Sequence, residues 1–191
     1  MENIMTEKEA LLALKQGNKE AFSFIFDIYA PKIERYIKRL LKNHVESIDI
    51  VSNVFMKVYV NFQSYNISEP FSPWIYRIAH NESVNFIKKK RALPFSWFDT
   101  DTLFPSFLDT KETYIESNFD KEHMKKVIEK SMELVREKDR EILQLFYFED
   151  LSYEEMSTVL MIPKNTVGVR LNRAKTRIAD ILKKQNIDRH L

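Results

Sequence analysis

Basic, amide and hydroxyl side chains recur between residues 164 and 184 at a spacing that suits hydrogen bonding to DNA. Arginine and lysine neutralise phosphates, whereas arginine and asparagine can also read base edges in the major groove. The stretch holds seven basic residues and the single acid Asp180. If it is helical, one side presents Val169, Asn172, Arg173 and Thr176, flanked by Arg170 and Arg177. The pattern favours a duplex DNA interface, and a merely solvated charged face is the alternative.

The element that must position these side chains is a pair of short helices joined by a tight turn. Ser152 followed by Glu155 is a capping box, so a helix should begin there. Pro163 should end it, because proline disfavours a helical predecessor and lacks an N–H. Asn165 or Thr166 can cap a second helix, whose inward side is apolar. The pattern predicts a helix-turn-helix, with the DNA-facing side chains on its second helix.

A second group of side chains that could contact nucleic acid follows Pro73. A long helix is predicted there, through Arg91, in which Trp74 and Tyr76 alternate with amides and bases. Aromatic rings can stack on unpaired bases, and amides can read an unpaired base edge. Spacing alone equally allows Trp74 and Tyr76 to fill the core. Residues 63–73 before the helix contain two prolines and predict a loop.

Composition excludes several other kinds of chemistry. The chain has no cysteine, its four histidines are scattered, and its only glycines are Gly17 and Gly168. Thiolate metal sites, disulfides and glycine-rich phosphate loops are therefore excluded, and we expect no enzyme, no cofactor and no small-molecule substrate. There is no long apolar run and no signal-peptide pattern, so we expect a cytoplasmic protein without membrane insertion.

Composition also predicts an all-α fold of two helical domains. The 191 residues include only 2 glycines and 6 prolines, too few for the turns that strands need. Residues 1–91 carry a net charge of +4, residues 92–118 of −4, and residues 119–191 of +2. Residues 92–118 combine acids with aromatics and show no helical period. We expect them to be an acidic linker between domains at 1–91 and 119–191, with aromatics docking on a partner or on the domains.

Apolar spacing predicts several helices in the first domain. One should end at Gly17, another should start after Asn18, and Pro31 should open a further one. A basic face after Pro31 suits either solvent or nucleic acid. The next helix begins near Ser47 or Asp49 and should bury Phe55. Its outer face carries Asp49, Ser52, Asn53 and Lys57, and the pattern alone assigns no task to them.

These motifs, in this order, resemble the bacterial RNA polymerase sigma factors of the extracytoplasmic-function (ECF) type, over nearly the whole chain. The most specific run is Trp74 to Asn81, which is close to the family's W-L-Y-R-I-A-R-N. In the C-terminal part, Leu151 to Met156 and Thr166 to Leu171 resemble the helix-turn-helix of sigma region 4. The N-terminal part resembles sigma region 2.

The resemblance implies a role for each part. Asp49, Ser52, Asn53 and Phe55 would bind core polymerase at its β′ clamp, the C-terminal domain would meet the β flap, and the linker would run toward the active site. The first domain would melt the −10 element, with Tyr65, Asn66, Phe71, Trp74, Arg77, His80, Asn81, Asn85, Lys88 and Lys89. The second would hold the −35 element, with Lys164, Asn165, Thr166, Gly168, Val169, Asn172, Arg173 and Thr176. The family also implies a possible anti-sigma partner.

The chain departs from the family pattern in both binding regions. The family's A-E-D-L-V-Q is Ser47 to Ser52 here, with Ile48 and Ser52 in place of two polar contacts. The family's G-T-V-K-S-R is Asn165 to Arg170 here, so Gly168 and Val169 replace a lysine and a serine. The −35 preference of relatives is therefore not transferable, and Gly168 could let the helix backbone approach DNA closely.

Two other functions compete with a sigma factor. A stand-alone helix-turn-helix regulator would bind duplex DNA without polymerase, usually as a dimer on a palindrome. No coiled-coil dimer seam is visible, and the aromatic, basic N-terminal part would have no task. A module that only sequesters polymerase would not need Arg170 and Arg173.

Overall fold

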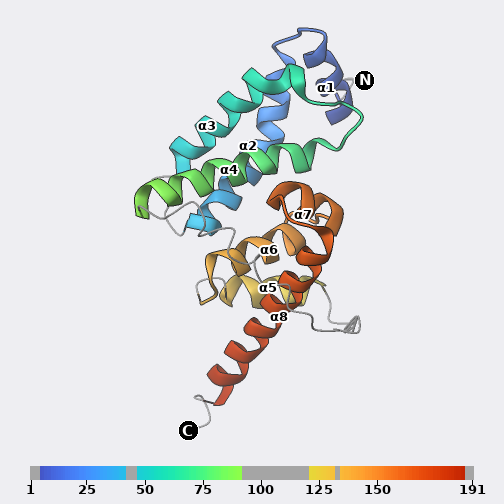
Figure 1. Ribbon diagram of the computed structural model, residues 1–191. Coiled ribbons are helices and arrows are strands. Elements are labelled where there is room, and N and C mark those ends of the chain that lie inside the picture. Colours follow the sequence, from blue (N-terminus) through green and yellow to red (C-terminus); the bar gives the residue numbers. More distant parts are fainter. Residues whose placement is uncertain (1–4, 42–46, 92–120, 132–133, 188–191) are drawn as a thin grey trace.

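The computed structural model describes residues 5–41, 47–91, 121–131 and 134–187, apart from a few side chains within helices, and these ranges contain helices but no strand (Figure 1). This confirms the predicted all-α fold. The helices are α1 (Glu7–Lys15), α2 (Ala21–Leu41), α3 (Ser47–Asn61), the short 3-10 helix η1 (Phe62–Ser64), α4 (Phe71–Arg91), α5 (Lys121–Ser131), α6 (Glu137–Tyr147), α7 (Tyr153–Leu160) and α8 (Lys164–Ile187). The predicted linker at 92–118 lies outside the described residues.

Helices α1 to α4 form an N-terminal lobe around an aromatic core. Tyr29, Phe62, Tyr65 and Phe71 are all nearly inaccessible to solvent, and Trp74 packs against three of these rings at centroid distances of 5.0 to 6.4 Å. Edge-to-face and tilted pairs of this kind stabilise a core beyond the area that they bury. The rings lie where η1, the following turn and the start of α4 meet, so they fix the beginning of α4.

Helix α2 runs through Pro31 without a break, so the prediction that Pro31 opens a separate helix was wrong. A proline inside a helix removes one hydrogen bond and crowds the preceding turn, at a cost of about 3 kcal/mol. Here the apolar side is continuous across it: Ile25, Tyr29, Ile33 and Ile37 are all buried. Packing of that side against α1, α3 and α4 outweighs the local cost of the proline.

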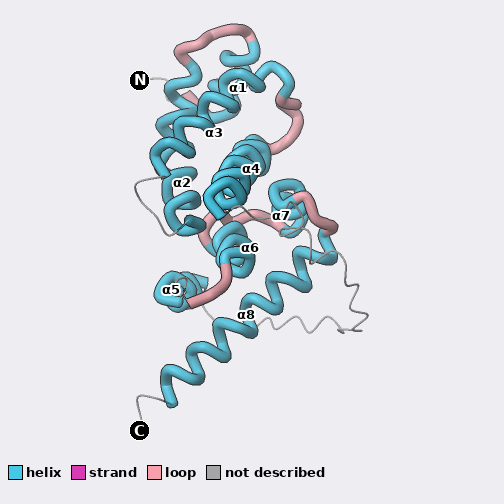
Figure 2. Tube along the Cα trace, turned by 60° about the vertical axis from the view of Figure 1, so that its left-hand side comes forward, coloured by secondary structure: helices cyan, strands magenta, loops and turns pink. Residues whose placement is uncertain are grey.

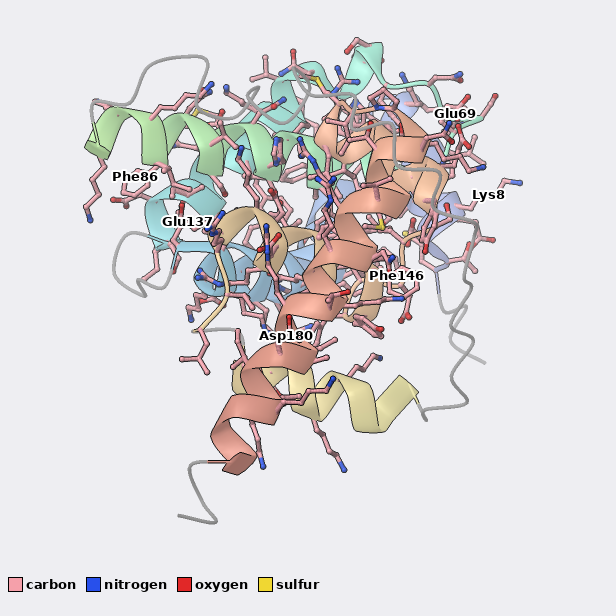
Figure 3. The ribbon with its side chains drawn as sticks, turned by 60° about the horizontal axis from the view of Figure 1, so that its bottom comes forward. Lys8, Glu69, Phe86, Glu137, Phe146 and Asp180 are labelled. Atoms are coloured by element: carbon pink, nitrogen blue, oxygen red, sulfur yellow. The ribbon has the colours of Figure 1, made fainter. Side chains whose placement is uncertain are left out.

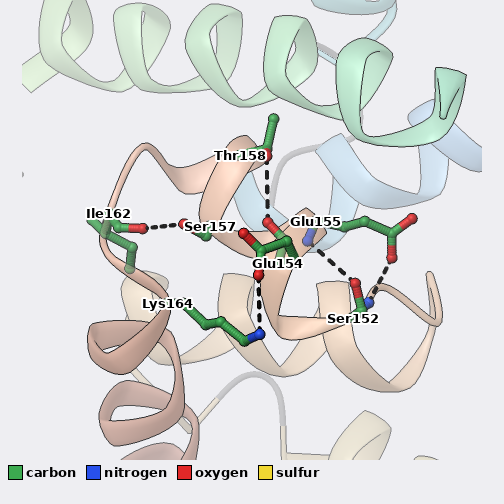
Figure 4. A network of polar contacts seen from close by, with 7 residues as sticks. All are labelled: Ser152, Glu154, Glu155, Ser157, Thr158, Ile162 and Lys164. Carbon is green, nitrogen blue, oxygen red and sulfur yellow. Dashed lines mark hydrogen bonds and ion pairs between the residues drawn. The ribbon is translucent and has the colours of Figure 1, made fainter. Parts of the chain in front are cut away.

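Helices α5 to α8 form a C-terminal lobe, and α7 and α8 make the predicted helix-turn-helix (Figure 4). Ser152 caps α7: its Oγ accepts from the Glu155 N–H at 3.2 Å, and its own N–H donates to Glu155 Oε2 at 2.8 Å. Met161 ends α7 in the left-handed conformation, with φ of 54°. Helix α8 starts directly after Pro163, slightly earlier than predicted, because the fixed φ of proline suits a helix start.

The two lobes pack directly against each other. Helix α7 lies along α4, and α6 lies against the end of α2 (Figures 1 and 2). Helix α8 leaves this contact and extends away from the N-terminal lobe. None of the described helices combines the length and the hydropathy that a membrane span requires. Among the described side chains, no cluster of acidic or histidine groups could hold a metal ion.

Candidate nucleic-acid interface

Helix α8 presents its predicted polar side to solvent. Val167, Leu171, Ala174 and Ile178 are buried against α6 and α7, as the apolar spacing predicted. The side chains on the opposite side of α8 form a surface that we call the recognition face. Its exposed members are Lys164, Asn165, Val169, Asn172, Arg173 and Thr176. Their side chains are on the outer helix of the corner, where a helix-turn-helix meets the major groove.

Short polar contacts hold the corner in shape (Figure 4). The Ser157 hydroxyl donates to the carbonyl of Ile162 at 2.6 Å, which fixes the turn between the helices. Lys164 Nζ lies 3.0 Å from Glu154 Oε2, and both groups are largely exposed, so this pair adds little stability and leaves the lysine available to a phosphate. These contacts fix the orientation of α8, which carries the recognition face, relative to α7.

Some basic residues of the stretch serve the lobe itself. The Lys175 ammonium lies 4.8 Å from the Phe146 ring centre and 5.6 Å from that of Tyr147, and burial lowers its pKa. Arg177 pairs with Asp139 of α6, and Arg170 is only half exposed. The basic face is therefore narrower than the sequence suggested. Arg173 and Arg177 are its exposed arginines.

Gly168 does not provide an opening for DNA in this arrangement. The nearest atom to a Cβ at Gly168 would be Tyr153 Cε2 of α7, at 3.6 Å. The missing side chain therefore points toward the neighbouring helix rather than outward, which corrects the expectation of a close approach of the backbone to DNA. Gly168 is half-buried. Its position does not support the −35 contact that the family resemblance implied for it.

Replacing Gly168 by alanine is expected to raise the free energy of unfolding by about 1 kcal/mol, because alanine is preferred in helix interiors and 3.6 Å is an ordinary van der Waals distance. Urea denaturation followed by circular dichroism measures the change. Gly17→Ala is the control: Gly17 has φ of +91°, so there the same substitution should destabilise the chain. Destabilisation by Gly168→Ala would show that this helix needs the glycine.

Helices α3 and α4, together with η1, line an open cavity that gathers several predicted −10 residues. The cavity is about 430 Å³ and is lined by Lys57, Asn61, Ser64, Trp74, Arg77, Ile78, Asn81 and Glu82. Trp74, Arg77 and Asn81 were predicted; the α3 and η1 side chains were not. Lys57 Nζ lies 2.5 Å from Glu82 Oε1 across the cavity. An indole, amides and a charged pair around one opening suit the face and the polar edge of an unpaired base.

Three predicted contact residues are in the core instead. Phe55 is 4% exposed, Tyr65 3% and Phe71 2%. Phe55 packs against Phe22 and Phe26, while Tyr65 and Phe71 pack against each other and Trp74. Burial raises the pKa of Tyr65 to about 12. The prediction that these three side chains make direct contacts is therefore wrong, because they are packed inside the N-terminal lobe.

The other predicted −10 residues are spread along α4 and its preceding turn. Asn66, Asn85 and Lys89 are exposed, and Lys88 is half-buried. Asn66 Oδ1 accepts from the Ser68 N–H at 3.1 Å, which shapes the turn. His80 is different: its Nδ1 lies 2.6 Å from Glu141 Oε1 of the C-terminal lobe, so in this arrangement it faces α6 and not solvent.

The outer face of α3 is exposed, as predicted for Asp49, Ser52 and Asn53. The Ser52 hydroxyl donates to the Ile48 carbonyl at 3.0 Å. This face is more apolar than expected, because Ile48, Met56 and Val60 are 62%, 64% and 70% exposed. The spacing of these three residues along α3 was visible in the sequence. No sequence signal showed that their side chains would be exposed to solvent rather than packed against another helix.

Comparison with known proteins shows the family to which the chain belongs. The family described as Sigma-70 region 2 matches residues 25–93, and the one described as Sigma-70, region 4 matches residues 125–178. The ECF RNA polymerase sigma factor SigW of Bacillus subtilis strain 168 is 30% identical over 177 residues, covering 90% of this chain and 94% of SigW. The chain belongs to the ECF sigma factors.

Another relative of this ECF sigma factor is similar to it over nearly its whole length, and two solved structures share its fold. The ECF RNA polymerase sigma-E factor of Escherichia coli K12 is 26% identical over 183 residues, covering 93% of this chain and 95% of the relative. CnrH, solved in complex with the cytosolic domain of CnrY, superposes with a TM-score of 0.62 at 17% identity and covers 93% of this chain and 97% of its own. The sigma factor RpoE of Bartonella quintana, solved with the anti-sigma factor NepR, gives 0.60 at 21%, covering 85% and 96%. At these identities the structures indicate a shared fold.

Proposed function

We propose that this ECF sigma factor binds core RNA polymerase and directs it to promoters, with the N-terminal lobe melting the −10 element and α8 holding the −35 element. The observation that supports the proposal is the presence on one chain of two different surfaces whose side chains suit two forms of DNA. One is an exposed recognition face on a helix-turn-helix, and the other is a cavity lined by an indole, amides and charges. The first suits duplex DNA and the second suits an unpaired base.

At the −35 element, α8 would lie in the major groove with Asn172 and Arg173 toward base edges and Lys164 toward a phosphate. Asn165, Thr166, Val169 and Thr176 would line the same groove. The Thr176 hydroxyl already donates to the Asn172 carbonyl at 3.1 Å, so its contact with DNA would be through its oxygen or its methyl group. The exposed fraction of Val169, 42%, suits contact with a thymine methyl group.

Arg173→Ala is expected to weaken −35 binding by roughly 1 to 3 kcal/mol, because a bidentate arginine–guanine contact discriminates by about that much. Electrophoretic mobility shifts of the polymerase–sigma complex on promoter DNA measure the loss. Lys183→Ala is a suitable control, since Lys183 is exposed on α8 but lies far along the helix from the recognition face. Equal affinities of Arg173→Ala and the wild type would show that Arg173 is only a solvated surface residue and does not read a base.

At the −10 element, Trp74 would stack on an unpaired base while Asn81 and Arg77 meet its edge and phosphate. Asn61 and Lys57 extend this set from α3. Asn66, Asn85, Lys88 and Lys89 would follow the strand along the turn and along α4. Removing a base from the duplex costs a few kcal/mol, which stacking and hydrogen bonds in a shaped pocket can offset.

The proposal also assigns partners and boundaries. Asp49, Ser52 and Asn53 would meet the β′ clamp, joined by the exposed Ile48 and Met56, and the C-terminal lobe would meet the β flap. Domains at 1–91 and 119–191 with an acidic linker at 92–118 remain part of the proposal. Binding to core polymerase would put the protein in the cytoplasm, and the proposal gives the protein no catalytic site of its own. An anti-sigma factor is a further partner to test, because RpoE was solved with NepR.

Dependence on core polymerase separates this proposal from a stand-alone regulator. We expect the purified chain to co-elute with core polymerase in gel filtration, and we expect specific promoter binding only for the complex. Binding of duplex promoter DNA with nanomolar affinity by the chain alone, without co-elution, would favour the regulator. Co-elution without any promoter binding would favour a module that sequesters polymerase.

A further inference from the structure

One wall of the cavity between α3 and α4 is made by η1, the shortest helical element of the N-terminal lobe. Asn61 precedes this turn and Ser64 ends it, and both side chains line the cavity. The Tyr65 N–H closes the turn by donating to the Phe62 carbonyl at 3.0 Å, and the Asn61 side chain does not cap its start. Hydrogen-bond geometry is poor in a 3-10 turn, so a turn this short needs support from outside itself.

Lys15 at the end of α1 supplies such support. Its Nζ donates to the Gln63 carbonyl in the middle of η1 at 2.8 Å. The same ammonium lies 5.5 Å from the centre of the Phe62 ring, which is within the range of a cation–π interaction. A hydrogen bond from a charged donor is stronger than one between neutral groups. One side chain of α1 thus holds both the backbone and a ring of η1.

The ring that Lys15 contacts leads to the indole of the cavity. Phe62 is 2% exposed and meets the Trp74 ring edge-on at a centroid distance of 6.4 Å. Trp74 lines the cavity. A displacement of Phe62 would therefore be passed to the indole on which we propose that a base stacks.

The backbone that Lys15 holds leads to the amide side of the cavity. The Ser64 hydroxyl donates to the Asn61 carbonyl at 2.7 Å, and Asn61 Nδ2 donates to the Lys57 carbonyl at 2.8 Å. All three side chains line the cavity. Because these bonds form a chain from η1 into α3, the place of η1 sets the positions of the polar groups that a base edge would meet.

Helix α1 is anchored firmly enough to act as a support. Thr6 and Glu9 form a capping box at its start, with N–H to oxygen distances of 2.7 and 3.3 Å between donor and acceptor atoms. Leu11 and Leu14 are buried where α1 packs on α2. Lys15 is in the last turn of α1, where the helix dipole also favours a cation.

We propose that Lys15 is a positioning residue for base capture, which holds η1 where the cavity is shaped for an unpaired base of the −10 strand. The inference rests on the proposed function of that cavity. Lys15 does not itself line the cavity, so it would act through η1 and not by touching the base. Helix α1 thereby acquires a role in promoter opening besides its part in the core.

A purely structural role for Lys15 makes a different prediction. If the contact only stabilised the lobe, removing it would lower the free energy of unfolding, but the molecules that remain folded would open promoters at the wild-type rate. A positioning role requires that folded molecules open promoters more slowly, and that a second cation at the same place restores the rate.

Lys15→Met, Lys15→Arg and Lys8→Met form the set of variants. Methionine keeps an unbranched apolar stem near Phe62 and removes the donor and the charge. Arginine can donate to the same carbonyl and lie over the same ring. Lys8 is exposed in the first turn of α1 and its side chain points away from the lobe (Figure 3), so Lys8→Met makes the same chemical change away from η1. Circular dichroism establishes folding, and Lys15→Gln replaces the methionine variant if that variant does not fold.

Amide hydrogen exchange of Tyr65, followed by nuclear magnetic resonance, is the primary measurement, because this N–H closes η1. Exchange through local opening reports the stability of the turn. In Lys15→Met the Tyr65 amide should exchange roughly three- to ten-fold faster than in the wild type, while the amide of Val58 within α3 keeps its rate. Lys15→Arg and Lys8→Met should match the wild type. Unchanged exchange of Tyr65 in folded Lys15→Met would overturn the proposal.

Promoter opening with core polymerase is the second measurement. Permanganate reactivity should show that Lys15→Met opens the promoter roughly three- to ten-fold more slowly than the wild type, with unchanged affinity for core polymerase. Lys15→Arg should open it at the wild-type rate. An equal loss in Lys15→Arg, or a loss in Lys8→Met, would overturn the positioning role.

Asn81→Ala, measured alongside, separates the two ways in which the inference can fail. Slow opening by Asn81→Ala with wild-type opening by Lys15→Met would show that the cavity is used and that Lys15 is only structural. Wild-type opening by both variants, with faster exchange of Tyr65 in Lys15→Met, would overturn the proposed role of the cavity, and Lys15 would then hold η1 without any part in opening.

Discussion

Replacing Arg140 by methionine is expected to lower the free energy of unfolding by roughly 3 to 5 kcal/mol, since three carbonyls, two of them in buried hydrogen bonds, would lose a charged donor. Arg140 is 2% exposed, and its guanidinium joins the end of α2 in the N-terminal lobe to the Val135 carbonyl in the turn before α6. Methionine fills a similar length but donates nothing. Urea denaturation measures the loss.

Arg136→Met is the matched control for this substitution. Arg136 precedes the first turn of α6, its side chain makes no capping bond, and it is exposed. The same chemical change there should alter stability by less than about 0.5 kcal/mol. If both variants unfold at the same urea concentration, the buried guanidinium contributes no more than a surface arginine, and the account of the interlobe contact is wrong.

Asn81→Ala is expected to slow promoter opening by roughly ten- to a hundred-fold, because an unpaired base in the α4 cavity would lose a hydrogen-bond partner in a desolvated site. Asn81 lines the cavity beside Trp74 and Arg77. Affinity for core polymerase should not change, since the exposed face of α3 is untouched. Permanganate reactivity of unpaired thymines reports opening, and co-elution reports core binding.

Gln63→Ala is the control for Asn81→Ala, because Gln63 carries an amide in the same lobe that is exposed and does not line the cavity. It should open promoters at the wild-type rate. Equal losses of opening and of core binding in Asn81→Ala would mean that the amide supports the lobe rather than the unpaired base.

Local signals made the helix-turn-helix predictable. The Ser152 and Glu155 capping box and the Pro163 stop lie within a few residues of the boundaries that they set, and the apolar spacing of α8 fixes which side faces out. The exposed positions of Asn172 and Arg173 followed from the same spacing. The all-α class followed from composition, because so few glycines and prolines cannot supply the turns of a sheet.

Features that depend on distant residues were not predictable. An aromatic residue such as Tyr65 or Phe71 can pack in a core or stack on a base, and the sequence does not show which neighbours it has. Both residues are in the core. Pro31 carries a local helix-start signal that packing overrides. His80 and Glu141 are 61 residues apart, and no periodicity joins them. The contribution of α3 to the cavity was hidden for the same reason, because Lys57 and Asn61 meet α4 only in the folded lobe.

Run-off transcription with purified core polymerase, on genomic DNA and with mapped start sites, tests the central claim most directly. With the chain added, transcripts should begin at a limited set of sites that share two elements at fixed spacing, and Asn81→Ala and Arg173→Ala should reduce them while Gln63→Ala does not. Identical transcripts with and without the chain would contradict the account.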